Sequence, residues 1–148
     1  MKTILVPVDF SPVTAAVIEQ AARLAEAFGA AVWLLHVAQP EPDFVGFETG
    51  PQSVREQVAS EMRGTHRRLQ DESSRLRERG IDATAIQVQG ATIEAILHEA
   101  ERLHADVIVL GSHGHGALHR ALLGSVSEGV LHRATRPVLL LPSRAATS

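Results

Sequence analysis

The chain has 148 residues, a formal net charge of −3 and no cysteine. This length suits one domain over residues 1–148, and the lack of cysteine excludes disulfides and thiol catalysis. The basic residues gather on one predicted helix without interleaved aromatic side chains, so we expect no nucleic-acid binding. No apolar run reaches the ~18 residues of a membrane span and the N-terminus lacks a signal-peptide pattern, so we expect a cytoplasmic protein without a membrane segment.

Apolar segments divide the chain into five predicted strands and four predicted helices. The strands are expected at residues 3–8, 31–37, 81–88, 106–110 and 137–141. The helices are expected at residues 12–28, 54–79, 90–103 and 126–134. Ser11 predicts the N-cap of the first helix, with Pro12 at its first helical position. Three prolines and two glycines predict a loop over residues 39–53.

Strict alternation of strands and helices predicts an α/β fold with a doubly wound parallel sheet. In such sheets, ligands bind beyond the carboxyl ends of the strands, where the winding direction reverses. Asp9 follows the first predicted strand, and Gly111 follows the fourth. If these two strands are neighbours, both residues line one crevice.

The strongest functional signal is Gly111-Ser112-His113-Gly114, which is followed after nine residues by Gly124-Ser125. Glycine can adopt positive φ angles and lets backbone amides approach an anion, and the amides that begin the next helix favour negative charge. The pattern therefore predicts a phosphate site. It is not a Walker loop, because the only lysine is Lys2, and its glycine spacing differs from that of a dinucleotide fingerprint.

These motifs resemble the ATP-binding branch of the universal stress protein family. The resemblance covers nearly the whole chain and rests on the segments 4–11, 35–37, 105–114, 123–127 and 136–140. The family motif G-x2-G-x9-G-(S/T) is matched by Gly111, Gly114, Gly124 and Ser125. The resemblance implies a flavodoxin-like sheet of five parallel strands in the order 3-2-1-4-5, with ATP between strands one and four. It also implies a nucleotide-dependent stress-response or regulatory module with little or no catalysis.

Carried over by position, the resemblance implies that the purine lies near Pro7, Asp9 and the backbone of Val37. It places the ribose near Gly111 and the phosphates at the Gly111–Gly114 turn and the start of the last helix. The implied binding residues are Pro7, Val8, Asp9, Val37, Gly111, Ser112, His113, Gly114, His115, Gly124, Ser125, Val126 and Ser127. Mg or Mn would be held through the phosphates. His115 stands where relatives often carry Lys or Arg, so positive charge has to come from Arg120 or from protonated histidine.

Some of these residues also have structural interpretations. Ser125 and Glu128 form the pattern of a capping box, in which the Ser125 hydroxyl accepts from the Glu128 amide. Asp9 could interact with the positive end of the first helix instead of a ligand. We favour ligand contact for Ser125 and Asp9, and a structural role for Asp106 at the start of strand four.

The histidines His113, His115 and His119 have a spacing that could bind a metal, but no carboxylate or cysteine accompanies them. We therefore expect no dedicated metal site.

Two other functions stay open from the sequence. A slow ATP hydrolase or another nucleotide-using enzyme could occupy the same crevice, although the motif has no lysine and no evident base, and no catalytic residue is assigned. A structural dimer module with an empty crevice is the second. Residues 136–141 are mainly apolar and fall at the predicted sheet edge, so we expect a homodimer through this strand.

Overall fold

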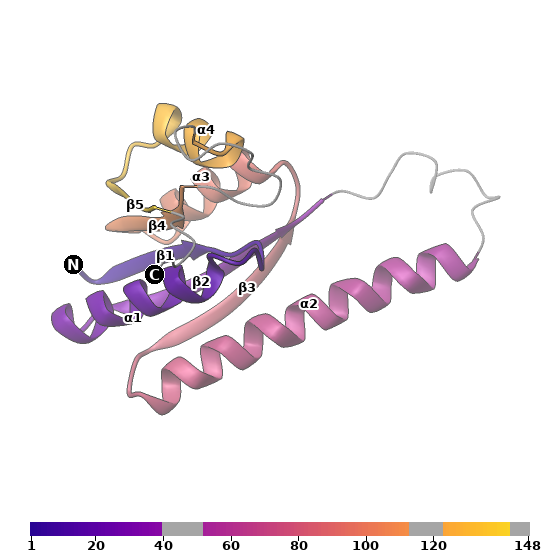
Figure 1. Cartoon of the computed structure of the whole chain (residues 1–148), viewed down its shortest axis with the longest axis horizontal. Coiled ribbons are helices and arrows are strands. Elements are labelled where there is room, and N and C mark those ends of the chain that lie inside the picture. The colour runs from indigo at the N-terminus through magenta and orange to yellow at the C-terminus, as the bar shows by residue number, and fades with distance from the viewer. Residues whose placement is uncertain (40–51, 113–122, 143–148) are drawn as a thin grey trace, which may run out of the picture.

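The structure is a computed structural model that describes residues 1–39, 52–112 and 123–142 (Figure 1). Its elements are β1 (Thr3–Pro7), α1 (Thr14–Phe28), β2 (Ala31–Ala38), α2 (Gln52–Glu78), β3 (Ala83–Gln89), α3 (Thr92–Arg102), β4 (Val107–Gly111), α4 (Ser125–Arg133) and β5 (Val138–Leu141). All paired strands are parallel, and their order is β3-β2-β1-β4-β5. Within the described ranges, the predicted α/β class, strand order and four helices are confirmed.

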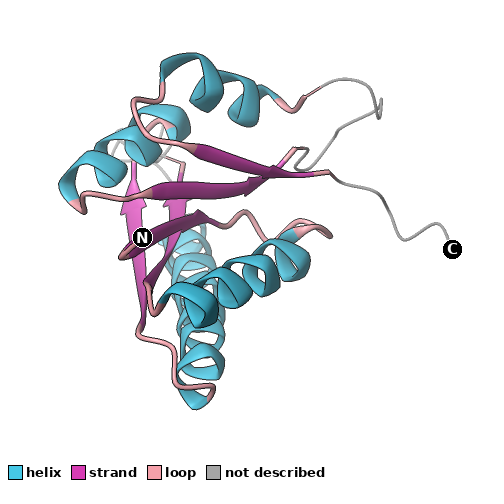
Figure 2. Cartoon of the chain, turned by 90° about the vertical axis from the view of Figure 1, so that its left-hand side faces the viewer, coloured by secondary structure: helices cyan, strands magenta, loops and turns pink. Residues whose placement is uncertain are grey.

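The sheet lies between two layers of helices, with α1 and α2 on one face and α3 and α4 on the other (Figure 2). Ile4 and Val6 of β1 pack toward α1 and α2, whereas Leu5 packs toward α3 and α4. All three side chains are fully buried. Because each fully buried aliphatic side chain contributes about 1.5–3 kcal/mol, the central strands hold the two layers together.

The element boundaries differ from the predictions in three informative places. The first helix begins at Thr14 with Val13 as its N-cap, so the predicted N-cap role of Ser11 is wrong. The second helix begins at Gln52, inside the predicted loop. The fourth strand continues through Gly111, so the first glycine of the motif belongs to the sheet.

The long helix α2 has two unlike halves. Its C-terminal part packs on the sheet through Leu69, Ser73 and Leu76, which are buried. Residues 55–68 include no buried side chain, and this half extends past the end of the sheet (Figure 1). Arg68 therefore lies at the point where the helix reaches the body of the protein.

Candidate functional site

The hydrogen-bonded pairing of β1 with β4 ends before the carboxyl edge of the sheet. Its last pair is Leu5 with Ile108, whereas the pairing of β1 with β2 continues to Pro7 with Leu35. Successive residues direct their main-chain groups to alternate neighbours, and the Val8 amide donates to Leu35 on β2. The main chain of Pro7 therefore faces β4, where proline has no N–H to donate. This loss of pairing falls at the strand pair where the winding direction reverses, which is the ligand position in doubly wound sheets.

The start of α4 is tied to the end of β4 by two hydrogen bonds. The Gly124 amide donates to the Ser112 carbonyl at 2.7 Å, and the Ser127 hydroxyl donates to the Gly111 carbonyl at 2.6 Å. Ser127 is only 4% exposed. These bonds bring the two halves of the predicted phosphate motif together, although they are more than ten residues apart in sequence.

Helix α4 begins without a side-chain cap. Gly124 is its N-cap, and the Glu128 amide donates to the Gly124 carbonyl at 2.9 Å, so the alternative interpretation of Ser125 and Glu128 as a capping box is wrong. Ser125 is exposed, and its hydroxyl makes no hydrogen bond to a described residue. The amides of Ser125, Val126 and Ser127 likewise have no acceptor within the described ranges. These amides and the helix dipole, about half a positive charge, form a place for an anion.

Asp9 lies in the turn that follows β1. Its Oδ1 accepts from the Ser11 amide at 2.9 Å and from the Thr14 hydroxyl at 3.3 Å. The structural interpretation of Asp9 is therefore correct in part, because it interacts with the start of α1. Continuing the strand registers places Asp9 level with Val37 on β2 and with Ser112 after β4. The predicted purine-side residues thus share one level of the sheet with the phosphate motif.

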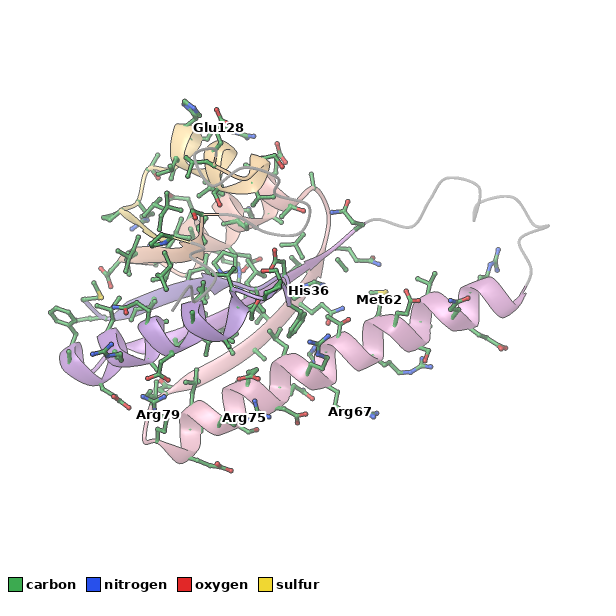
Figure 3. The ribbon with its side chains drawn as sticks, viewed as in Figure 1. His36, Met62, Arg67, Arg75, Arg79 and Glu128 are labelled. Carbon is green, nitrogen blue, oxygen red and sulfur yellow. The ribbon has the colours of Figure 1, made fainter. Side chains whose placement is uncertain are left out.

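Phe10, directly after Asp9, adopts a left-handed backbone conformation with φ 57°. For a residue with a Cβ this conformation costs about 1–2 kcal/mol, so surrounding contacts have to hold it. His36 supports the same turn, because its Nδ1–H donates to the Val8 carbonyl at 2.9 Å. Figure 3 shows His36 near the carboxyl end of β2. Phe10 and His36 lie in the segments 4–11 and 35–37 that carry the family resemblance, but neither was predicted as a site residue.

Of the other predicted site residues, Val8 is described by the structure and three lie outside the described ranges. The side chain of Val8 is buried in the core, and its amide and carbonyl already bond β2. His113, Gly114 and His115 lie outside the described residues, as do His119 and Arg120. Among the residues that are described, no group of three His, Cys, Asp or Glu side chains could hold a metal, and no helix is long and apolar enough to cross a membrane.

Comparison with known proteins agrees with this architecture. The sequence model of the Universal stress protein family matches residues 1–142. The chain belongs to the universal stress protein family. It is 30% identical to universal stress protein YxiE of Bacillus subtilis over 142 residues. This match covers 93% of this chain and 96% of that protein. It is also similar to the solved structure of hypothetical protein MJ0577, with a TM-score of 0.79 and 29% identity over 95% of this chain and 94% of that one.

Some structures that share the fold carry nucleotides. One is the universal stress protein from Archaeoglobus fulgidus in complex with dAMP, with a TM-score of 0.63 and 23% identity over 95% of this chain and 97% of that one. Another is a universal stress protein in complex with cAMP, with a TM-score of 0.65 and 23% identity over 95% of each chain. At this identity the likeness establishes the fold, and the ligands are properties of those proteins.

Proposed function

We propose that this universal stress protein binds ATP at the carboxyl ends of β1 and β4 and acts as a nucleotide-dependent stress-response or regulatory module. The observation that carries the proposal is the start of α4, where three amides and the Ser125 hydroxyl have no acceptor in the described chain while Ser127 and Gly124 fix the helix to β4. A phosphate is the anion that this arrangement suits, since it accepts several hydrogen bonds at once. Related structures with dAMP and cAMP support a nucleotide as the phosphate carrier.

In this proposal, the rest of the ligand takes the positions that the family resemblance implies. Phosphates occupy the Gly111–Gly114 turn and the start of α4, and Mg or Mn binds through them. The ribose lies by Gly111. The purine lies by Asp9 and Val37, which are level with each other at the ends of the neighbouring strands β1 and β2. His113, Gly114 and His115 complete the phosphate side in this proposal.

We expect little or no catalysis at this site. Rapid phosphoryl transfer needs a positioned cation, a metal and a group that orients the nucleophile. The described residues of the proposed site, which are 7–9, 37, 111, 112 and 124–127, include no cationic side chain. ATP turnover should therefore stay well below the ~1 s⁻¹ of ordinary enzymes.

Ser125→Asp tests the phosphate assignment by isothermal calorimetry with ATP and magnesium. An aspartate at the first position of α4 suits the helix dipole, so the fold should keep its stability, while its charge repels phosphate. We expect the affinity for ATP to fall by at least about tenfold, which corresponds to ~1.4 kcal/mol. Gln70→Glu is the matched control, because it adds the same charge on the exposed surface of α2. A parent that binds no ATP, or a Ser125→Asp variant that binds it equally well, would overturn the proposal.

We also propose that two copies associate through the 136–141 strand. In the described sheet β5 is an edge strand, paired only with β4. Leu139 on β5 is 36% exposed, and Leu123 before α4 and Leu131 on α4 are exposed as well. An apolar edge of this kind favours a further strand or apolar surface, and Pro137 restricts the pairing to a short segment.

Leu139→Asp tests this association by sedimentation at micromolar concentrations. Leu139 is the suitable position because Val138 and Leu140 pack against the core, where a charge would disturb folding. We expect a dimeric parent and a monomeric variant. Phe28→Asp, which replaces an apolar side chain 57% exposed at the end of α1, should leave the dimer intact. A monomeric parent, or a dimer that survives Leu139→Asp, would exclude the β5 interface.

A further inference from the structure

Three side chains from three parts of the chain lie against one another at the turn that carries Asp9. The ring of Phe10 lies 5.6 Å from the ring of His36, measured between centroids, with an interplanar angle of 46°. On Phe10, the guanidinium carbon of Arg68 lies 4.2 Å from the ring centroid. We call Arg68, Phe10 and His36 the stack.

Arg68 is well placed to hold this turn. It comes from α2 and directly precedes Leu69, which is fully buried, so its backbone is anchored in the body of the protein. In the described part of the chain Arg68 forms no ion pair with a carboxylate, and its recorded interaction is with the face of Phe10. A guanidinium over an aromatic face is attracted by the negative potential of the ring.

The contacts of the stack explain how Phe10 stays in its left-handed conformation. His36 fixes the preceding main chain through the Val8 carbonyl, and its ring borders Phe10 on one side. Arg68 contacts the ring face. Without these contacts, Phe10 would relax toward ordinary backbone angles, and the Asp9 carboxylate and the Ser11 amide that it accepts from would move with it.

We propose that Arg68 is a positioning residue for the nucleotide site: through Phe10 it fixes the turn that presents Asp9 at the carboxyl edge of the sheet. The inference rests on the proposed nucleotide binding and adds a role for α2, which contributes no residue to the predicted motif. Arg68 acts through another side chain and does not itself contact the ligand. Its contribution is therefore expected to disappear when Phe10 is replaced.

Arg68→Ala is compared with Arg67→Ala, which removes an exposed neighbour that has no recorded contact with the turn. The first measurement is hydrogen exchange of the Ser11 amide without nucleotide, and the second is the dissociation constant for ATP by calorimetry. A lost cation–π contact corresponds to about a threefold to tenfold change, so we expect exchange to accelerate and ATP affinity to weaken by that factor in Arg68→Ala alone. Arg68→Lys, which keeps a cation over the ring, should restore most of both.

The same pair of measurements in a Phe10→Leu background shows whether Arg68 acts through the ring. There, Arg68→Ala should change neither the exchange of Ser11 nor the affinity for ATP any further. Unchanged hydrogen exchange of the Ser11 amide in Arg68→Ala would show that Arg68 does not hold the turn, whether or not ATP binds. Faster exchange with parental ATP affinity, or an affinity loss that persists in the Phe10→Leu background, would overturn the positioning role. If the parent protein binds no ATP, the proposed function and the positioning role of Arg68 are both wrong, and this is known before any variant is compared.

Discussion

The sheet has an aspartate at its amino edge, where the strands begin, and another at its carboxyl edge, where they end, and the two form different hydrogen bonds. At the amino edge, Asp106 Oδ2 accepts from the main-chain amides of Lys2 and Thr3, at 2.7 and 2.9 Å, and so joins the start of β4 to the start of β1. These two hydrogen bonds hold the pKa of the Asp106 carboxyl below its usual value. At the carboxyl edge, Asp9 Oδ1 accepts from the Ser11 amide and the Thr14 hydroxyl, which belong to the same turn and to the start of α1.

The two edges also differ in how their hydrogen-bond donors are used. Near the amino edge, Arg136 and Thr135 both donate to the Glu101 carboxylate, and Arg136 also donates to the Ala105 carbonyl. At the carboxyl edge, the amides at the start of α4 have no acceptor within the described residues. At the amino edge, charged side chains are thus used in bonds that close the fold, whereas at the carboxyl edge the bonds of Gly124 and Ser127 to β4 leave amide donors at the start of α4 for a ligand. We infer that stability and binding can be changed separately.

Replacing each of the two aspartates by alanine is the strongest test of this comparison. Asp106→Ala should lower the melting temperature clearly and leave ATP binding intact, because it removes bonds between β1 and β4 at the far edge. Asp9→Ala should weaken ATP binding by about tenfold, the effect of one charge-assisted hydrogen bond of ~1.5 kcal/mol, with a smaller loss in melting temperature. Thermal unfolding and calorimetry on both variants decide the matter. If both variants lose stability and affinity to the same degree, the separation of the two edges is wrong.

The strands and helices that hold the site could be predicted from the sequence, whereas individual hydrogen bonds of its side chains could not. Buried strands alternate with amphipathic helices because a parallel sheet needs crossovers, and this pattern is readable residue by residue. The Gly111 and Gly124 motif was correctly placed at a strand end and a helix start, since glycine and apolar runs are local signals. The capping box, the alternative interpretation of Ser125, does not form because the Gly124 carbonyl accepts the Glu128 amide.

The stack of Arg68, Phe10 and His36 could not be predicted in the same way. Its members lie on α2, in the turn after β1 and on β2, and their contact depends on the packing of α2 across the sheet. The left-handed angle of Phe10 is equally hidden, because aromatic residues rarely adopt it and no glycine marks the position. Local patterns therefore locate a site, whereas tertiary packing decides which side chains support it.

The pH dependence of stability provides a second test at the amino edge, with a moderate effect. Hydrogen bonds from Arg136 and then Thr135 lower the pKa of Glu101 from 4.5 to about 2. A depressed carboxyl pKa means that the stabilisation is fully present above the unfolded value, near 4.5, and is lost as the pH falls toward about 2. The difference in melting temperature between the parent and Glu101→Gln should therefore be largest above pH 4.5 and shrink toward pH 2.

Glu61→Gln is the control for this titration, because Glu61 is exposed and forms no ion pair with a described residue. Its melting temperature should stay close to that of the parent throughout the same pH range. A Glu101→Gln difference that does not change with pH would show that the Arg136 and Thr135 bonds do not contribute to stability. ATP affinity at neutral pH should be the same in both variants, since Glu101 belongs to the opposite edge.

The smallest expected effect concerns Ser11, which was predicted as the N-cap of the first helix but lies in the turn before it. Ser11 and Ser127 are both buried serines there, at 6% and 4% exposure, but only the Ser127 hydroxyl has a hydrogen bond, to Gly111. The Ser11 hydroxyl has no partner in the described structure, so Ser11→Ala removes an unsatisfied polar group and should change the free energy of unfolding by no more than about 0.5 kcal/mol, toward greater stability. Ser127→Ala should cost about 1 kcal/mol, as for a typical buried hydrogen bond. Chemical denaturation of both variants distinguishes the cases: a loss near 1 kcal/mol for Ser11→Ala would restore the N-cap that the sequence predicted.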